Sequence, residues 1–81
     1  MKVGNFKMTI SACPTLWECT VDGQPAYIRF RWGYIALKLA QGRGLRNEEI
    51  IGEQISDDLD GTLDNADMID WLAKQPNVEI I

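Results

Sequence analysis

Residues 24–39 alternate apolar and polar side chains, and the phase of that alternation changes at Gly33. The apolar positions are even-numbered before the glycine and odd-numbered after it: Ala26, Ile28, Phe30 and Trp32, then Ile35, Leu37 and Leu39. A strand presents successive side chains to opposite faces of its sheet. One straight strand would therefore turn its apolar residues outward halfway along, so the chain must turn or bulge at Gly33.

A β-hairpin accommodates this change of phase in either of two registers. A turn at Gly33-Tyr34 puts glycine first, as type II′ turns prefer, but it places Arg29 opposite Lys38. A turn at Trp32-Gly33 removes that repulsion but requires a positive φ at Trp32, which a bulky residue resists. A long strand with a bulge at Gly33 is the third arrangement. We expect a hairpin and leave its register open.

Residues 15–22 show the same alternation, and they end at Asp22-Gly23, a strong signal for a two-residue hairpin turn. With that turn, the apolar residues of both hairpins lie on one face of the sheet. Two turns that agree on the buried face are mutually supporting evidence. They predict a three-stranded antiparallel meander over about residues 15–39.

The flanking segments complete the prediction of a single small α+β domain spanning residues 1–81. We expect an N-terminal strand at 5–12, a loop at 40–47, a short strand or irregular segment at 48–56, a helix at about 64–75, and a C-terminal edge strand at 78–81. Asp64 is the predicted N-cap of the helix, and Pro76 stops it. The helix has one apolar stripe, which we expect to pack on the apolar face of the sheet.

The composition argues against several classes of function. The chain has no histidine, so the commonest general base is absent, and neither Ser11 nor Ser56 lies in a nucleophile-elbow context. No apolar run approaches the length of a transmembrane helix. Cys13 and Cys19 are expected to be free thiols of a cytoplasmic protein, with Cys19 facing inward. We therefore expect no enzymatic activity, no cofactor and no membrane insertion.

Charge is divided unevenly along the chain. Residues 1–46 contain seven lysines and arginines against two carboxylates, whereas residues 47–81 contain one lysine against ten carboxylates. The formal net charge is −4. Either the two halves compensate one another within the fold, or they form separate surfaces of opposite sign.

Residues 56–67, SDDLDGTLDNAD, concentrate aspartates ahead of the predicted helix. Against a twelve-position calcium loop, oxygen-bearing residues fall at five ligand positions: Asp58, Asp60, Thr62, Asp64 and Asp67. The segment resembles the calcium loop of EF-hand or dockerin-type proteins, and this resemblance implies a calcium site at those residues. It departs from the pattern at Ser56, in the first position, and at Asp67, where the family has a glutamate. An acidic turn before an Asp-capped helix, and a carboxylate patch for a cationic partner, are the other interpretations.

The polar face of the predicted meander interleaves aromatic and basic residues. Its candidate binding residues are Tyr27, Arg29, Arg31, Tyr34 and Lys38. Single-stranded nucleic-acid binders use such faces, because rings stack on bases while guanidinium groups meet phosphates. The same residue types are common on exposed strands, so the other interpretation is a solvated sheet face or one covered by the acidic C-terminal half. The three tryptophans, Trp17, Trp32 and Trp71, fall on the apolar sides of their elements and are expected in the core.

These features favour a non-enzymatic interaction module that binds a protein partner or forms a homodimer. Calcium binding and single-stranded nucleic-acid binding are the alternatives. A small domain of this kind is typical of accessory proteins of phages or other mobile elements, which is an expectation about class only.

Overall fold

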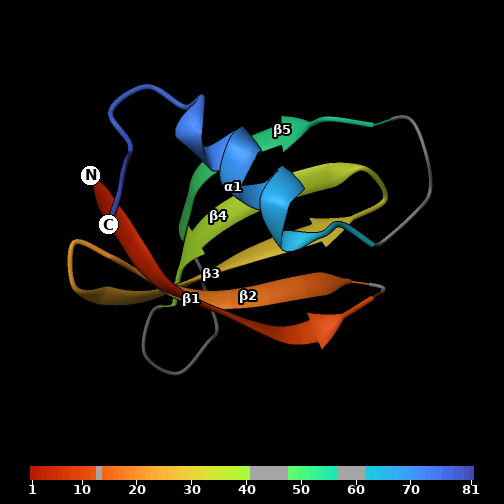
Figure 1. Cartoon of the computed structure of the whole chain (residues 1–81), viewed down its shortest axis with the longest axis horizontal. Coiled ribbons are helices and arrows are strands. Elements are labelled where there is room, and N and C mark those ends of the chain that lie inside the picture. Colours follow the sequence, from red (N-terminus) through yellow and green to blue (C-terminus); the bar gives the residue numbers. More distant parts are fainter. Residues whose placement is uncertain (13, 41–47, 57–61) are drawn as a thin grey trace.

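The computed structural model describes residues 1–12, 14–40, 48–56 and 62–81. Its elements, in chain order, are β1 (Lys2–Ser11), β2 (Thr15–Val21), β3 (Gln24–Arg31), β4 (Tyr34–Leu39), β5 (Glu48–Gln54), α1 (Asn65–Ala73) and β6 (Glu79–Ile80). They form one six-stranded sheet in the order β5-β4-β3-β2-β1-β6, with the helix beside it (Figure 1). The α+β class and the C-terminal helix are confirmed, but the sheet is larger than a three-stranded meander with flanking strands. The predicted loop lies largely outside the described residues.

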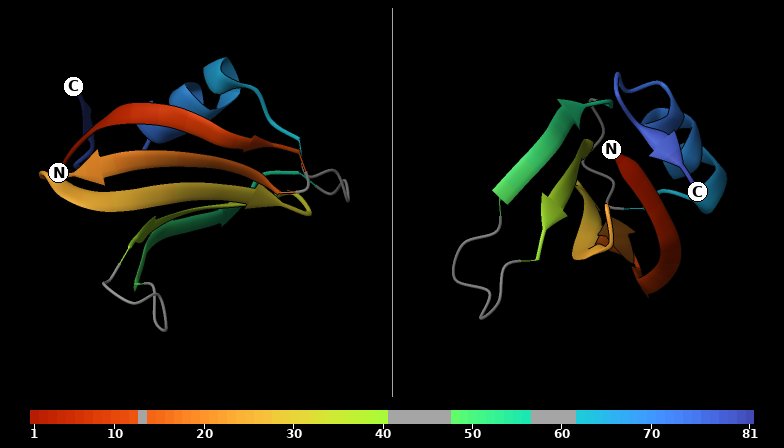
Figure 2. Two further views of the ribbon diagram at one scale, coloured as in Figure 1. Left: turned by 90° about the horizontal axis from the view of Figure 1, so that it is seen from below. Right: turned by 90° about the vertical axis from the view of Figure 1, so that its left-hand side faces the viewer.

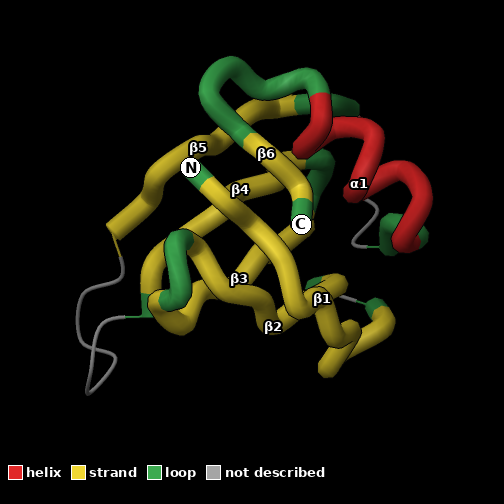
Figure 3. The backbone as a smooth tube through the Cα atoms, turned by 60° about the vertical axis from the view of Figure 1, so that its left-hand side comes forward, coloured by secondary structure: helices red, strands yellow, loops and turns green. Residues whose placement is uncertain are grey.

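The sheet is antiparallel except at its last pair, where β6 runs parallel to β1. This pairing brings the two ends of the chain together, as Figure 3 shows. The amide of Glu79 donates to the carbonyl of Met1 over 2.8 Å, and the amide of Ile81 donates to the carbonyl of Val3 over 3.0 Å. The predicted C-terminal edge strand is therefore present, although it is only two residues long.

The sheet curls strongly, and α1 lies on its concave side (Figure 2). Register shifts interrupt the β1–β2 ladder twice and the β4–β5 ladder once. Such bulges increase the local twist of a strand pair, which accounts for the curl. We call the concave, helix-facing side of the sheet the inner face and the opposite side the outer face.

The core lies between the inner face and α1. From the sheet it contains the alternating residues predicted to share one side, among them Trp17, Ile28 and Leu37, all at most 1% exposed. The helix contributes Met68 and Leu72, which are equally buried. Each fully buried side chain of this size stabilises the fold by about 1.5–3 kcal/mol.

Both hairpins have two-residue turns with positive φ at both positions, the signature of type I′. Asp22 and Gly23 have φ of 49° and 82°, as the sequence predicts for this turn. In the second hairpin the turn is Trp32-Gly33, with φ of 53° and 75°. The alternative turn at Gly33-Tyr34 is therefore wrong, and so is the prediction that Trp32 belongs to the core. A side chain in the turn leaves the ladder, and that of Trp32 is 58% exposed.

Asp64 caps α1 as predicted: its carboxylate accepts a hydrogen bond from the amide of Asp67 over 2.8 Å. We expect Asp64→Ala to lower the free energy of unfolding by about 1 kcal/mol, because an orphan helix amide loses its acceptor. Asp64→Asn keeps an acceptor and should stay close to the wild type. Chemical denaturation of the three proteins measures this difference. Equal midpoints for the wild type and Asp64→Ala would mean that the Asp64 cap does not stabilise the helix.

Candidate interaction site on the outer face of the sheet

The aromatic and basic residues predicted on the meander lie on the outer face. The register pairs Tyr27 with Lys38 and Arg31 with Tyr34. Arg29 lies opposite Ala36 and not opposite Lys38, so the like-charge pair of the other register does not form. The small side chain of Ala36 leaves a depression among its larger neighbours.

This depression has a volume of about 290 Å³, and we call it the outer hollow. Its lining residues are Arg29, Arg31, Trp32, Tyr34, Ala36 and Lys38. Four of the five predicted binding residues therefore share one site. The fifth, Tyr27, lines a separate hollow of about 380 Å³ together with Glu18 and Pro25.

Trp32 is the residue of the outer hollow that the sequence interpretation missed. Its ring lies under the guanidinium of Arg31, whose Cζ is 4.0 Å from the ring centroid, a cation–π contact. The repulsion between Arg29 and Lys38 in the other register is the sequence signal that could have found it. Accepting that signal puts Trp32 into the turn, next to the exposed basic residues.

The tip of the hairpin is held by the last residue of β5 and by the chain that follows it. The side-chain amide of Gln54 donates to the carbonyl of Trp32 over 2.9 Å and to that of Ser56 over 2.6 Å. The amide of Ile55 donates to the carbonyl of Gly33 over 2.8 Å. These bonds fix the backbone of Trp32 without engaging its ring, so the ring is presented on a rigid support.

Tyr34 is oriented by β5. Its hydroxyl donates to Oε2 of Glu49 over 3.0 Å, and this hydrogen bond raises the pKa of Tyr34 above its usual value. Gly52 makes room for the ring, since a Cβ at that position would collide with the Tyr34 hydroxyl. The phenol therefore stays protonated at neutral pH, and its hydroxyl lies over Gly52 of the neighbouring strand.

Cys19 faces the core and takes no part in the outer hollow. Burial raises the pKa of its thiol to about 11, so it is protonated at neutral pH and behaves as a small apolar side chain. The structure describes Cys19 as a free cysteine, and Cys13 lies outside the described residues.

The proposed calcium ligands are only partly described. Asp58 and Asp60 lie outside the described residues, whereas Thr62, Asp64 and Asp67 lie within them. Asp64 already uses one carboxylate oxygen for the helix cap. Among the described residues, no group of three or more metal-binding side chains is assembled. Calcium binding by this segment stays a prediction.

Comparison of the chain with protein-family models, curated proteins and solved structures finds no significant match. Within the described residues, no helix has the length and apolar character needed to cross a membrane.

Proposed function

We propose that this protein is a non-enzymatic interaction module whose outer hollow binds an acidic segment of a protein partner. The observation that carries the proposal is Trp32, a large aromatic side chain held in the left-handed backbone region and 58% exposed. A bulky residue in that region is strained by roughly 1–2 kcal/mol. Such strain is found chiefly at functional sites, where the surrounding structure imposes it.

The chemistry of the outer hollow supports an acidic partner. Its described lining contains three cations, two aromatic rings and no carboxylate. Tryptophan, tyrosine and arginine are the residues that most often dominate the binding energy of protein interfaces. The guanidinium of Arg31 over the Trp32 ring combines an apolar surface with a positive charge at a single point. A segment with an apolar anchor beside a carboxylate matches this arrangement.

Single-stranded nucleic acid is the second candidate. The exposed ring of Trp32 adds support for it that the sequence alone did not provide. Ring stacking and phosphate contacts from Arg29, Arg31 and Lys38 would follow the usual mode of such binders. The net charge of −4 repels both candidates, but it repels a polyanion with one charge per nucleotide more strongly than a short acidic segment. We therefore place the protein partner first. Self-association through this face and a role on a phage or other mobile element remain further proposals.

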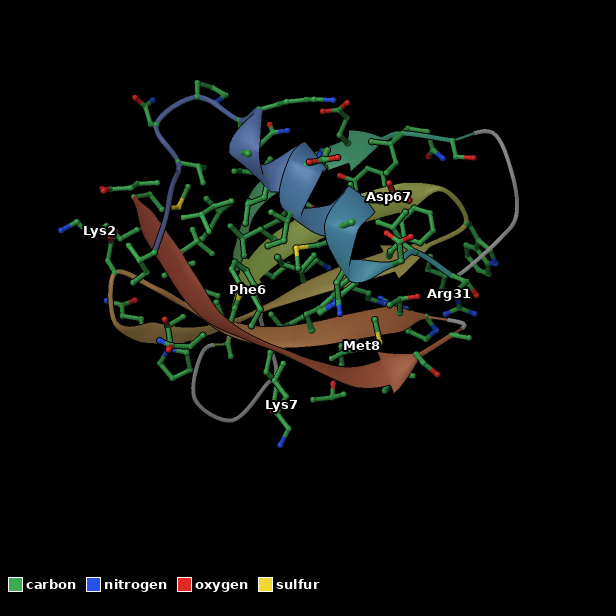
Figure 4. All side chains as sticks on the ribbon, viewed as in Figure 1. Lys2, Phe6, Lys7, Met8, Arg31 and Asp67 are labelled. Carbon is green, nitrogen blue, oxygen red and sulfur yellow. The ribbon has the colours of Figure 1, made fainter. Side chains whose placement is uncertain are left out.

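The test is a pull-down from a lysate of the source organism with a charge-reversal pair. The Arg29→Glu/Arg31→Glu protein is expected to lose its partner, with affinity lowered at least about thirtyfold, because two cations at the interface centre become anions. Lys2→Glu/Lys7→Glu makes the same charge change on β1, where Figure 4 shows both side chains away from Arg31. This control should retain the partner.

Three results would contradict the proposal or replace it. A partner that binds the Arg29→Glu/Arg31→Glu protein as well as the wild type places the interface elsewhere. Salt-sensitive binding of a fluorescent single-stranded oligonucleotide, lost in the same variant, would establish nucleic acid as the ligand. A dimer in sedimentation that this variant dissolves would show that the partner is a second copy.

A further inference from the structure

β5 ends the sheet: its one strand neighbour in the described part of the chain is β4. The β4–β5 register ends at Tyr34 opposite Gln54, so Gly33 and Ile55 are the next facing pair, and the Ile55 amide donates to the Gly33 carbonyl. Hydrogen-bonded and non-bonded pairs alternate along antiparallel strands. Gly52 and Gln54 therefore direct their backbone N–H and C=O groups away from β4. An edge of this kind can accept another strand.

A groove of about 500 Å³ lies beside this edge, between β5 and α1. It contains three carboxylates, on Glu53, Asp67 and Asp70, against the single lysine Lys74. Glu53 projects from the inner face because it pairs with buried Ile35, and its Oε1 accepts a 3.4 Å hydrogen bond from a helix indole N–H. The groove is therefore negatively charged and lies where the inward side chains of an added strand would point.

We propose that the β5 edge and this groove together bind an extended segment of a partner protein, which pairs with β5 and inserts an arginine or lysine side chain into the groove. Backbone hydrogen bonds to Gly52 and Gln54 would provide affinity, and the carboxylates would select the inserted side chain. A guanidinium can bind carboxylates through two parallel hydrogen bonds. Its aliphatic stem would pack on Ile55, which is 37% exposed.

Charge selects this occupant over a second copy of the chain. Antiparallel pairing of β5 with β5 of another molecule through Gly52 and Gln54 would set the two Glu53 carboxylates opposite each other on the inner face. Like charges facing each other across strands are destabilising, and charged edge residues are a common protection against self-pairing. The groove is negatively charged and lies on the inner face, whereas the outer hollow is positively charged and lies on the outer face. The two are therefore separate surfaces.

The experiment selects a displayed library of random peptides, about ten residues long, on the whole protein. Enriched peptides should alternate β-branched residues with at least one arginine or lysine. In the complex, hydrogen exchange at the Gly52 and Gln54 amides should slow. Replacing the basic residue of a selected peptide by citrulline, a neutral isostere of arginine, should lower affinity about tenfold.

A matched pair of variants tests the edge itself. Gln54→Pro removes the outward amide and should abolish peptide binding. Gln54→Ala loses the same side-chain bonds to Trp32 and Ser56 but keeps the backbone amide, so its affinity for the peptide should stay far above that of Gln54→Pro. Should the proline variant fail to fold, Glu53→Gln/Asp70→Asn should still lower affinity about tenfold. Its control, Glu18→Gln/Glu79→Gln, removes two carboxylates outside the groove.

The proposal is overturned by any of four results. These are no enrichment, enriched peptides without basic residues, equal affinities for the two Gln54 variants, and a dimer that Gln54→Pro dissolves. Enriched peptides that are acidic and depend on Arg31 are a case of the second result, and they would locate the binding at the outer hollow.

Discussion

Trp32→Asn should weaken binding at the outer hollow by about thirtyfold without lowering the free energy of unfolding. The loss of binding follows from removing the ring that is the most exposed large aromatic surface of the site, 58% accessible. Stability should hold because asparagine adopts positive φ readily and is favoured in type I′ turns, whereas tryptophan is strained there. The substitution relieves the backbone strain at this position. Loss of the contact with Arg31, worth about 0.5–1 kcal/mol at an exposed site, offsets part of that gain in stability.

Two measurements on the same variants separate the role of the ring from that of the turn. Affinity is measured by titration with the recovered partner, and stability by denaturation with urea. Trp32→Phe keeps an aromatic ring, so its affinity should fall less than that of Trp32→Asn. A drop of more than about 1 kcal/mol in the stability of Trp32→Asn would make Trp32 a structural anchor and undermine the proposed function.

The first hairpin could be predicted from sequence because two local signals coincide there. Asp22-Gly23 is a favoured type I′ pair, and the parity of the flanking residues requires the same turn. The second hairpin offered two registers, and each placed apolar pairs on one face. The deciding bonds come from Gln54 and Ile55, more than twenty residues further along the chain, and local pattern reasoning does not reach that far.

The candidate site shows the same division between local and non-local information. Strand parity alone correctly places Arg29, Arg31, Tyr34 and Lys38 on the outer face. Trp32 joins them only after the register is known. The groove beside β5 depends on how α1 packs against the curled sheet, which is tertiary information. The parallel β1–β6 pair joins opposite ends of the chain, so no local turn signal in the sequence predicts it.

Gly33→Ala should cost about 2–4 kcal/mol of stability, far more than Gly23→Ala, although both glycines are the second residue of a type I′ turn. Their φ values are similar, 75° and 82°, so the backbone penalty of a Cβ is about 1 kcal/mol in each. The surroundings differ. A Cβ at Gly23 has nothing within 4 Å, whereas one at Gly33 would collide with the backbone carbonyl of Ser56.

The excess cost at Gly33 should appear together with a loss of binding. Relieving the collision requires the segment after β5 to move away, which breaks the hydrogen bonds from Gln54 and Ile55 to the turn. The turn that presents Trp32 would then lose its support, so affinity at the outer hollow should fall in Gly33→Ala and remain unchanged in Gly23→Ala. Urea denaturation and partner titration of the two variants test this. Equal effects at both glycines would mean that the contact with Ser56 does not constrain the turn, and that the ring is not presented on a rigid support.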